Sequence, residues 1–363
     1  MNPMSFFDII TRNKLFIAFL FVIQISLFGQ HTDWINYTYT NKVAEILTDG
    51  DYLWVATDGG LYKYNKVTEQ YTFFSRANAN LPDNHLRSLA KDKYGQIWLT
   101  SHFRGIGCFY GNKCIIFNSQ NSGLPSNQWN MKVLIDEAGN KWIGSLMWLV
   151  KFDDKNWKKW ETGNRASAYF SINDLAEDNN GNMWLGASWG LGKFTGIAVQ
   201  TFTEIEKDVF SLETDKNNNL WIGTNGQGLI KYNKNTFLTY NTSNSTIPGN
   251  VIRSIKFSSS GVMWFACGAK LVKFDGQNFF SFTNSLFSGG ISNIEIDKNN
   301  DIWIGTLFNG LVKYLVNQIF PPGTNQIEWD GRNNSGHPVS AGMYICILQT
   351  DDAFLSKKMV LLK

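Results

Sequence analysis

The chain has 363 residues, of which 43% are hydrophobic and 15% aromatic, and its 33 basic and 30 acidic residues leave a net charge of +3. This length can bury a large core and allows two or three domains. The charge is small and dispersed, which excludes the electrostatic footprint of a nucleic-acid-binding protein. Most of the 14 Trp and 27 Phe residues are expected to fill a core.

The N-terminal residues are typical of a targeting segment. Arg12 and Lys14 precede an apolar run of 15 residues, 15–29, which is too short to span a bilayer comfortably. We predict a secretory signal over residues 1–29, cleaved near Gly29 or Gln30, with an uncleaved anchor as the alternative. An extracellular, outer-surface or periplasmic protein with no stable membrane span after cleavage is therefore expected.

A repeated unit occupies residues 31–316, and its clearest copy is 215–240. One tryptophan marks each of seven copies: Trp54, Trp98, Trp142, Trp184, Trp221, Trp264 and Trp303. Their spacing averages about 41 residues, the period of four-stranded propeller blades. Two residues after each marker lies a small residue on the same side of the strand: Ala56, Thr100, Gly144, Gly186, Gly223, Ala266 and Gly305. A bulky indole beside a small residue suits closely packed neighbouring sheets.

These markers predict an all-β fold, a seven-bladed β-propeller. The seventh repeat supplies three strands, over residues 291–297, 302–306 and 311–314. Residues 34–38 resemble the outer strands of other repeats but have no repeat in front of them. We expect this N-terminal strand to complete the last blade, which would remove an open sheet edge.

An acidic residue lies six positions before the marker in five repeats, and the first and sixth repeats lack it. The five residues are Asp92, Asp136, Asp178, Asp215 and Asp297. A ring of calcium ligands is one interpretation. We favour a turn role, in which each carboxylate accepts backbone amides of the following Asn/Gly turn. We therefore predict no metal site and no cofactor.

The four cysteines are Cys108, Cys114, Cys267 and Cys346, and their spacing is unlike that of metal ligands. A three-residue hairpin loop over residues 110–112 would set Cys108 opposite Cys114 and permit a disulfide. Unpaired buried thiols are the alternative.

The repeats resemble the two-component-regulator propeller repeat. The resemblance rests on Asp-x-x-Gly-x-apolar-Trp-apolar-Gly-Thr followed by Gly-Leu-apolar-Lys-aromatic, which residues 215–232 and 297–314 match almost word for word. It implies a periplasmic sensing role of the kind found in hybrid histidine kinases, where oligosaccharides are recognised. Only 60 residues follow Trp303, so we expect a module that has no kinase or regulator domain of its own.

Residues 323–363 carry a second resemblance, on the segments 327–336, 339–344 and 357–363. They resemble the end of the Ig-like domain of flagellar hook-capping proteins and the C-terminal sorting domains of type IX secretion cargo. About 40 residues cannot form a full two-sheet sandwich. We therefore expect a short C-terminal β segment, and the resemblance implies the type IX secretion machinery as a partner.

The candidate ligand site lies on the propeller face formed by the loops between second and third strands and by the starts of first strands. The candidate ligand-binding residues are Arg87, His102, Arg104, Trp148, Trp189, Asn225, Gln227, Arg253, Phe308 and Asn309. Aromatic rings beside Arg, Asn and Gln suit a neutral polar ligand such as a sugar. Rim packing or solvation is the alternative for any one of them.

We predict a non-catalytic, secreted or cell-surface module that binds a glycan or a protein. Its histidines, His31, His85, His102 and His337, form no catalytic or metal-binding pattern along the chain. One alternative is a lyase-like or hydrolytic propeller enzyme similar to the streptogramin lyases, with His102 as its candidate base. The other is a structural adhesin or scaffold.

Overall fold

The computed structural model describes residues 29–36, 42–162, 171–314, 318–320, 342–349 and 354–361. The chain divides into two compact units, Ile35–Tyr314 and a smaller one of Met1–Trp34 with Leu315–Lys363. The predicted signal lies almost wholly outside the described residues. Within them, no helix combines the length and apolar character needed to cross a membrane.

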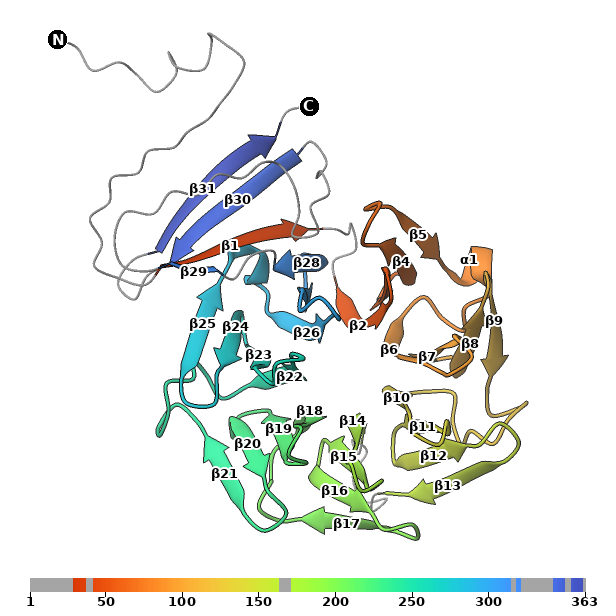
Figure 1. Ribbon diagram of the computed structural model, residues 1–363. Coiled ribbons are helices and arrows are strands. Elements are labelled where there is room, and N and C mark those ends of the chain that lie inside the picture. Colours follow the sequence, from red (N-terminus) through yellow and green to blue (C-terminus); the bar gives the residue numbers. More distant parts are fainter. Residues whose placement is uncertain are drawn as a thin grey trace, which may run out of the picture. The chain divides into compact units, whose positions relative to one another are not determined.

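The larger unit is a ring of seven antiparallel sheets, so the predicted seven-bladed propeller is confirmed (Figure 1). The first two blades are β2 (Val43–Asp49), β3 (Tyr52–Thr57), β4 (Leu61–Asn65) and β5 (Tyr71–Phe74), then β6 (Leu86–Lys91), β7 (Ile97–Ser101), β8 (Ile106–Tyr110) and β9 (Lys113–Phe117). The next two are β10 (Lys132–Ile135), β11 (Lys141–Gly144), β12 (Trp148–Phe152) and β13 (Trp157–Glu161), then β14 (Ile172–Glu177), β15 (Met183–Ala187), β16 (Gly190–Phe194) and β17 (Val199–Phe202).

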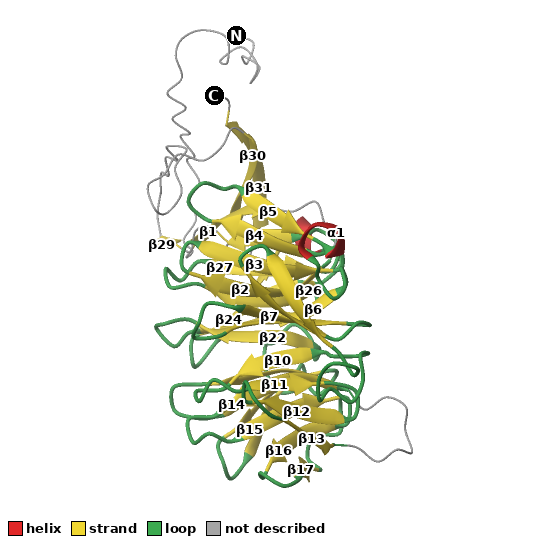
Figure 2. Cartoon of the chain, turned by 90° about the vertical axis from the view of Figure 1, so that its right-hand side faces the viewer, coloured by secondary structure: helices red, strands yellow, loops and turns green. Residues whose placement is uncertain are grey.

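The fifth and sixth blades are β18 (Val209–Thr214), β19 (Leu220–Thr224), β20 (Leu229–Tyr232) and β21 (Phe237–Tyr240), then β22 (Ile252–Phe257), β23 (Met263–Cys267), β24 (Lys270–Phe274) and β25 (Phe279–Thr283). The seventh begins with β26 (Ile291–Ile296), β27 (Ile302–Thr306) and β28 (Leu311–Tyr314). The helices described are one turn, α1 (Arg76–Ala79), and a 3-10 turn, η1 (Ser285–Phe287). Figure 2 shows the ring edge-on, with strands at its centre and loops along its two faces.

The N-terminal strand closes the last blade, as predicted, but it begins at Gly29, five residues before the predicted strand 34–38, and residues 37–38 lie outside the described residues. In the seventh sheet the strand after β28 is β1 (Gly29–Asn36), whose last two residues, Ile35 and Asn36, belong to the ring's own compact unit. No sheet edge of this blade is then left at β28, which is how propellers protect their closing blade.

The smaller unit contains the expected C-terminal β segment. Here β1 pairs antiparallel with β29 (Gln318–Phe320) and with β30 (Gly342–Gln349), placing Trp34 opposite Ile345. β30 continues into a hairpin with β31 (Phe354–Leu361). The segment 327–336, which carries part of the second resemblance, lies outside the described residues.

The marker tryptophans are buried between blades, with exposed fractions from 1% at Trp303 to 6% at Trp142. A buried indole N–H needs an acceptor, and the turn aspartate supplies it. Trp221 Nε1 donates to Asp215 Oδ2 over 3.0 Å, and the other carboxylate oxygen accepts the backbone N–H groups of Asn217 and Asn219. The predicted turn role of these aspartates is therefore confirmed.

The same indole-to-carboxylate bond recurs in six blades, at Asp49–Trp54, Asp92–Trp98, Asp136–Trp142, Asp178–Trp184, Asp215–Trp221 and Asp297–Trp303. In the first blade the acceptor lies five residues before the marker instead of six, so a fixed spacing misses it. In the sixth blade Ser258 occupies the turn and accepts the N–H of Val262. Within the described residues, no group of three or more His, Cys, Asp or Glu side chains could hold a metal ion.

The small residues two positions after the markers leave room for side chains of the next blade. A Cβ added at Gly144 would lie 2.7 Å from Ile172 Cγ2, at the start of the following inner strand. In the seventh blade, a Cβ at Gly305 would lie 2.6 Å from Val43 Cγ1 in the first blade. This contact shows that the ring is closed by the same packing that joins the third blade to the fourth.

Polar side chains of the inner strands link blades around the axis. Each accepts the backbone N–H of an inner strand in the next blade, at Glu45–Leu89, Ser88–Val133, Asp174–Leu212, Ser254–Ile294 and Asn293–Ile46. Lys132 also bridges Glu45 and Asp174, at 2.5 and 3.1 Å. Inner-strand amides facing the axis are thus satisfied by side chains of the neighbouring blade.

The alternative of unpaired thiols is correct for three of the four cysteines: Cys108, Cys114 and Cys267 are free and buried. The turn between β8 and β9 has two residues between its paired positions, because Tyr110 pairs with Lys113. Cys114 therefore lies opposite Phe109, one residue from Cys108. A one-residue shift moves a side chain to the other face of the sheet, so the two thiols point into different inter-blade cores. The predicted three-residue hairpin loop was therefore wrong.

We expect Asp215→Ala to lower the free energy of unfolding by about 1–3 kcal/mol, because it leaves the buried N–H of Trp221 without its acceptor. Urea unfolding followed by tryptophan fluorescence measures this. Ser258→Ala, at the equivalent turn of the sixth blade, is the control and should cost less. Equal midpoints for Asp215→Ala and the parent protein would contradict the role assigned to the carboxylate.

Candidate functional site

Because successive strands are antiparallel, the loops between second and third strands share one face of the ring with the connections into first strands. We call this the upper face, and we call the face with the other turns the lower face. On the upper face Thr224 Oγ1 donates to the carbonyl of Gly228 over 2.7 Å, and Ser101 and Thr306 do the same in their blades. Gly228 has φ +91°, and a Cβ there would lie 2.2 Å from the Tyr240 carbonyl oxygen. The loops are thus held tightly against their own blades.

Two predicted site residues, Arg87 and His102, meet on the upper face. Arg87 Nη2 lies 3.2 Å from His102 Nδ1. The imidazole stacks on Phe103, with centroids 4.2 Å apart, and meets Trp129 edge to face at 4.1 Å. We call His85, Arg87, His102, Phe103 and Trp129 the histidine cluster, since the ring of His85 also lies 5.3 Å from that of His102.

The imidazole of His102 is neutral at physiological pH. Burial, and then the nearby Arg87 guanidinium, lower its pKa from 6.5 to about 4. Because a guanidinium can only donate, Nδ1 is the acceptor and the proton is on Nε2. That Nε2 is buried and has no hydrogen-bond partner among the described residues. Burial, and then Arg87, also lower the pKa of Lys42.

Arg104 follows in the same loop and is exposed. Together with Phe103, Arg76, Asn118 and Asn127 it lines a groove of 310 Å³ on the upper face. Phe103 is 50% exposed, which makes its ring available for stacking. The histidine cluster and this groove therefore adjoin through the residues of a single loop.

Three predicted polar residues have local contacts in other blades. Gln227 Oε1 accepts the backbone N–H groups of Glu206 and Lys207, at 3.2 and 3.1 Å. Asn309 Nδ2 donates to the Leu286 carbonyl over 2.8 Å. These bonds anchor loops, whereas Asn225 is exposed and its Nδ2 is 3.5 Å from Asp208.

The remaining predicted residues also lie apart. Trp148 packs against the core between the second and third blades, and the ring of Trp189 covers Gly192. Arg253 lies over Phe210 at 4.9 Å, and Phe308 is 63% exposed. The structure therefore joins Arg87, His102 and Arg104, and distributes the other candidates around the ring.

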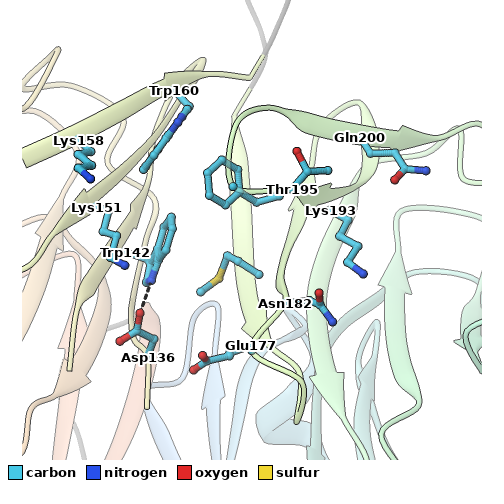
Figure 3. A pocket seen from close by; sticks show the side chains of 14 residues that line it. Asp136, Trp142, Lys151, Lys158, Trp160, Glu177, Asn182, Lys193, Thr195 and Gln200 are labelled. Carbon is cyan, nitrogen blue, oxygen red and sulfur yellow. Dashed lines mark hydrogen bonds between the residues drawn. The ribbon is translucent and has the colours of Figure 1, made fainter. Parts of the chain in front are cut away.

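A larger pocket that the sequence did not reveal opens on the lower face between the third and fourth blades (Figure 3). Its volume is 610 Å³, within the usual range for a small-ligand site. Its aromatic walls are Trp142, Trp160 and Phe194, and its charged lining consists of Lys151, Lys158, Lys193, Asp136 and Glu177. We call it the lower pocket. Its residues come from two repeats, so their spacing along the chain carries no signal.

The two carboxylates of the lower pocket are already engaged. Asp136 accepts the indole N–H of Trp142 at 2.8 Å and the amide of Asn140. Glu177 accepts the backbone N–H of Glu137 at 2.9 Å, and burial followed by nearby acidic groups raises its pKa. The pocket's lysines are therefore its dominant available charge.

This geometry defines a β-propeller in which each blade corresponds to one sequence repeat. The model of the two component regulator propeller family matches residues 169–189 and 203–226, in the fourth and fifth blades. The resemblance predicted from the repeats is thereby confirmed for this part of the chain. A search of curated proteins returned no match.

Several solved structures share the fold. Virginiamycin B lyase from Staphylococcus aureus has 13% identity and a TM-score of 0.66, covering 79% of this chain and 99% of its own. The extracellular domain of the hybrid two component system BT3049 from B. thetaiotaomicron has 14% identity and a TM-score of 0.65, covering 90% and 57%. PorZ, a surface component of the type-IX secretion system of Porphyromonas gingivalis, has 17% identity and a TM-score of 0.51, covering 88% and 51%. At these identities the comparison shows the fold alone.

We expect the imidazole of His102 to titrate at a pKa of about 4 in the folded protein, as measured by NMR. Since this pKa is below the unfolded value of about 6.5, its contribution to stability is complete above that pH and decreases as the pH falls towards 4. Arg87→Met should raise the pKa of His102, whereas Gln227→Ala, in another blade, should not. A pKa of about 6.5 for His102 in the parent protein would contradict the lowering of this pKa by burial and by Arg87.

Proposed function

We propose that this protein is an exported, non-catalytic propeller that recognises a glycan or protein ligand on its upper face. The observation that carries the proposal is the junction of the histidine cluster with the groove beside Arg104. There an exposed ring, Phe103, lies between cationic and amide groups on a rigid loop. Such a combination suits stacking and bidentate hydrogen bonding to a polar ligand.

The contacts of His102 weigh against the enzymatic alternative. A general base must reach the proton that it removes. Nδ1 of His102 faces the guanidinium of Arg87, and Nε2 is buried. A pKa of about 4 would also make the imidazole a weak base at neutral pH. The similarity to virginiamycin B lyase, at 13% identity, is one of fold.

Other features support a place outside the cell. The family model matched by the repeats is that of a two component regulator propeller. Propellers of similar fold include the extracellular domain of BT3049 and the surface protein PorZ. Export by the segment 1–29 and sorting by residues 323–363 complete this proposal.

Ligand recognition is tested by screening the protein on glycan and peptide arrays and measuring the affinity of any binder. We expect the double variant Phe103→Ala/Arg104→Ala to weaken binding at least roughly tenfold, because both side chains line the groove. Both are exposed, so folding should be unaffected. Phe308→Ala removes an exposed ring from another blade on the same face and is the matched control. An unchanged affinity in the double variant, or an equal loss in the control, would refute the groove beside Arg104 as the binding site.

Sorting is tested by deleting residues 327–363 and measuring the fraction of protein on the outer surface by protease accessibility. We expect that fraction to fall while signal processing is retained, because the deleted strands carry the sorting resemblance. Circular dichroism of the purified variant controls for loss of the propeller. Undiminished surface display of the folded variant would rule out a sorting role.

A further inference from the structure

The third blade carries an unusual row of side chains on the face that borders the lower pocket. In the strand register Trp142 lies opposite Lys151, and Lys151 lies opposite Lys158. Side chains in such a row project from the same side of the sheet. Two lysines are therefore directly opposite each other on neighbouring strands, an arrangement of like charges that destabilises a sheet.

The propeller fold does not require this pair. At the equivalent positions of other blades a lysine faces an uncharged side chain, at Lys63–Thr72, Lys193–Gln200, Lys231–Leu238 and Lys273–Phe280. The third-strand lysines have a structural role over the marker rings, as Lys151 lies 5.0 Å from the centroid of Trp142. Lys158 is the added charge, and it is exposed.

Neither Lys151 nor Lys158 forms an ion pair with any residue that the structure describes. Asp153, in the turn before β13, accepts the backbone N–H groups of Lys155 and Asn156. Asp136 and Glu177 are engaged as described above. The like-charge pair thus has no direct ion-pair partner among the described residues, and it lies beside a pocket of 610 Å³.

The rest of the lower pocket provides groups for a ring that carries hydroxyls. Trp160 lies on the same side of β13 as Lys158, two residues further along, and its ring meets Phe194 with centroids 4.6 Å apart. Gln200 lines the pocket with an amide group that can both donate and accept. Asn182 also lines it, but its Nδ2 donates to both carboxylate oxygens of Asp178, so only its amide oxygen is offered to a ligand. Figure 3 shows Trp160, Lys158 and Lys151 on one side of the pocket and Lys193 and Gln200 on the other.

We propose that the lower pocket binds an acidic saccharide, with a uronate carboxylate held between the ammonium groups of Lys151 and Lys158 and the sugar ring against Trp160. Carboxylate binding relieves the repulsion within the lysine pair and forms charge-assisted hydrogen bonds. The site is on the face opposite the histidine cluster, so it is independent of the function proposed above.

The test is isothermal titration calorimetry of the whole protein with tetragalacturonate, compared with the same oligosaccharide after methyl esterification of its carboxylates. We expect binding of the acid to weaken with rising ionic strength, and no binding of the ester. Lys158→Gln should weaken binding of the acid roughly tenfold. Lys159→Gln is the matched control, since this neighbour lies over Trp148 at 5.5 Å and does not line the pocket.

A second measurement needs no ligand. Because Lys158→Gln removes a like charge opposite Lys151, it should raise the thermal unfolding midpoint of the free protein, and Lys159→Gln should not. The proposal is overturned by equal binding of acid and ester, by an equal loss in Lys159→Gln, or by absence of binding to the acid. A glutamate peptide that binds at Lys158 while the uronate does not would overturn the saccharide assignment.

Discussion

The structure depends on the hydrogen bond between the buried marker indole and the aspartate of the turn before it, which is present in six of the seven blades. An indole that fills the space between blades takes its N–H out of water, and an unpaired donor there would be costly. The aspartate removes this cost while its other oxygen shapes the turn, as Asp215 does for Trp221. One side chain thus couples local turn chemistry to inter-blade packing, and six blades repeat the arrangement.

Because the repeated contacts hold the ring together, residues that depart from the repeat are available for recognition. His102 and Trp129 on the upper face have this character, and so does Lys158 on the lower face. His102 Nε2 is a buried donor with no partner among the described residues, and Lys158 lies opposite a like charge. A packed scaffold tolerates such groups poorly, and a ligand can satisfy them. The two faces therefore present different chemistry on one symmetric framework.

Sequence patterns predicted local features well and cross-strand neighbours poorly. The turn role of Asp215 followed from the residues around it, whereas the equivalent Asp49 was missed because its spacing differs by one residue. A difference of one residue in the hairpin loop likewise places Cys114 opposite Phe109 and not opposite Cys108. Of the predicted site residues, Arg87 and His102 were brought together, but Gln227 and Asn309 proved to anchor loops.

By itself the sequence determined the all-β class, the number of blades and the packing of the markers, because these are encoded within each repeat of about 41 residues. Only the tertiary structure decided which residues of different repeats share a pocket. The lower pocket joins Trp160 and Lys158 of the third blade to Gln200 of the fourth. Strand register and blade contact place them together, and neither leaves a periodic trace along the chain, since a single shifted residue turns a side chain to the opposite face.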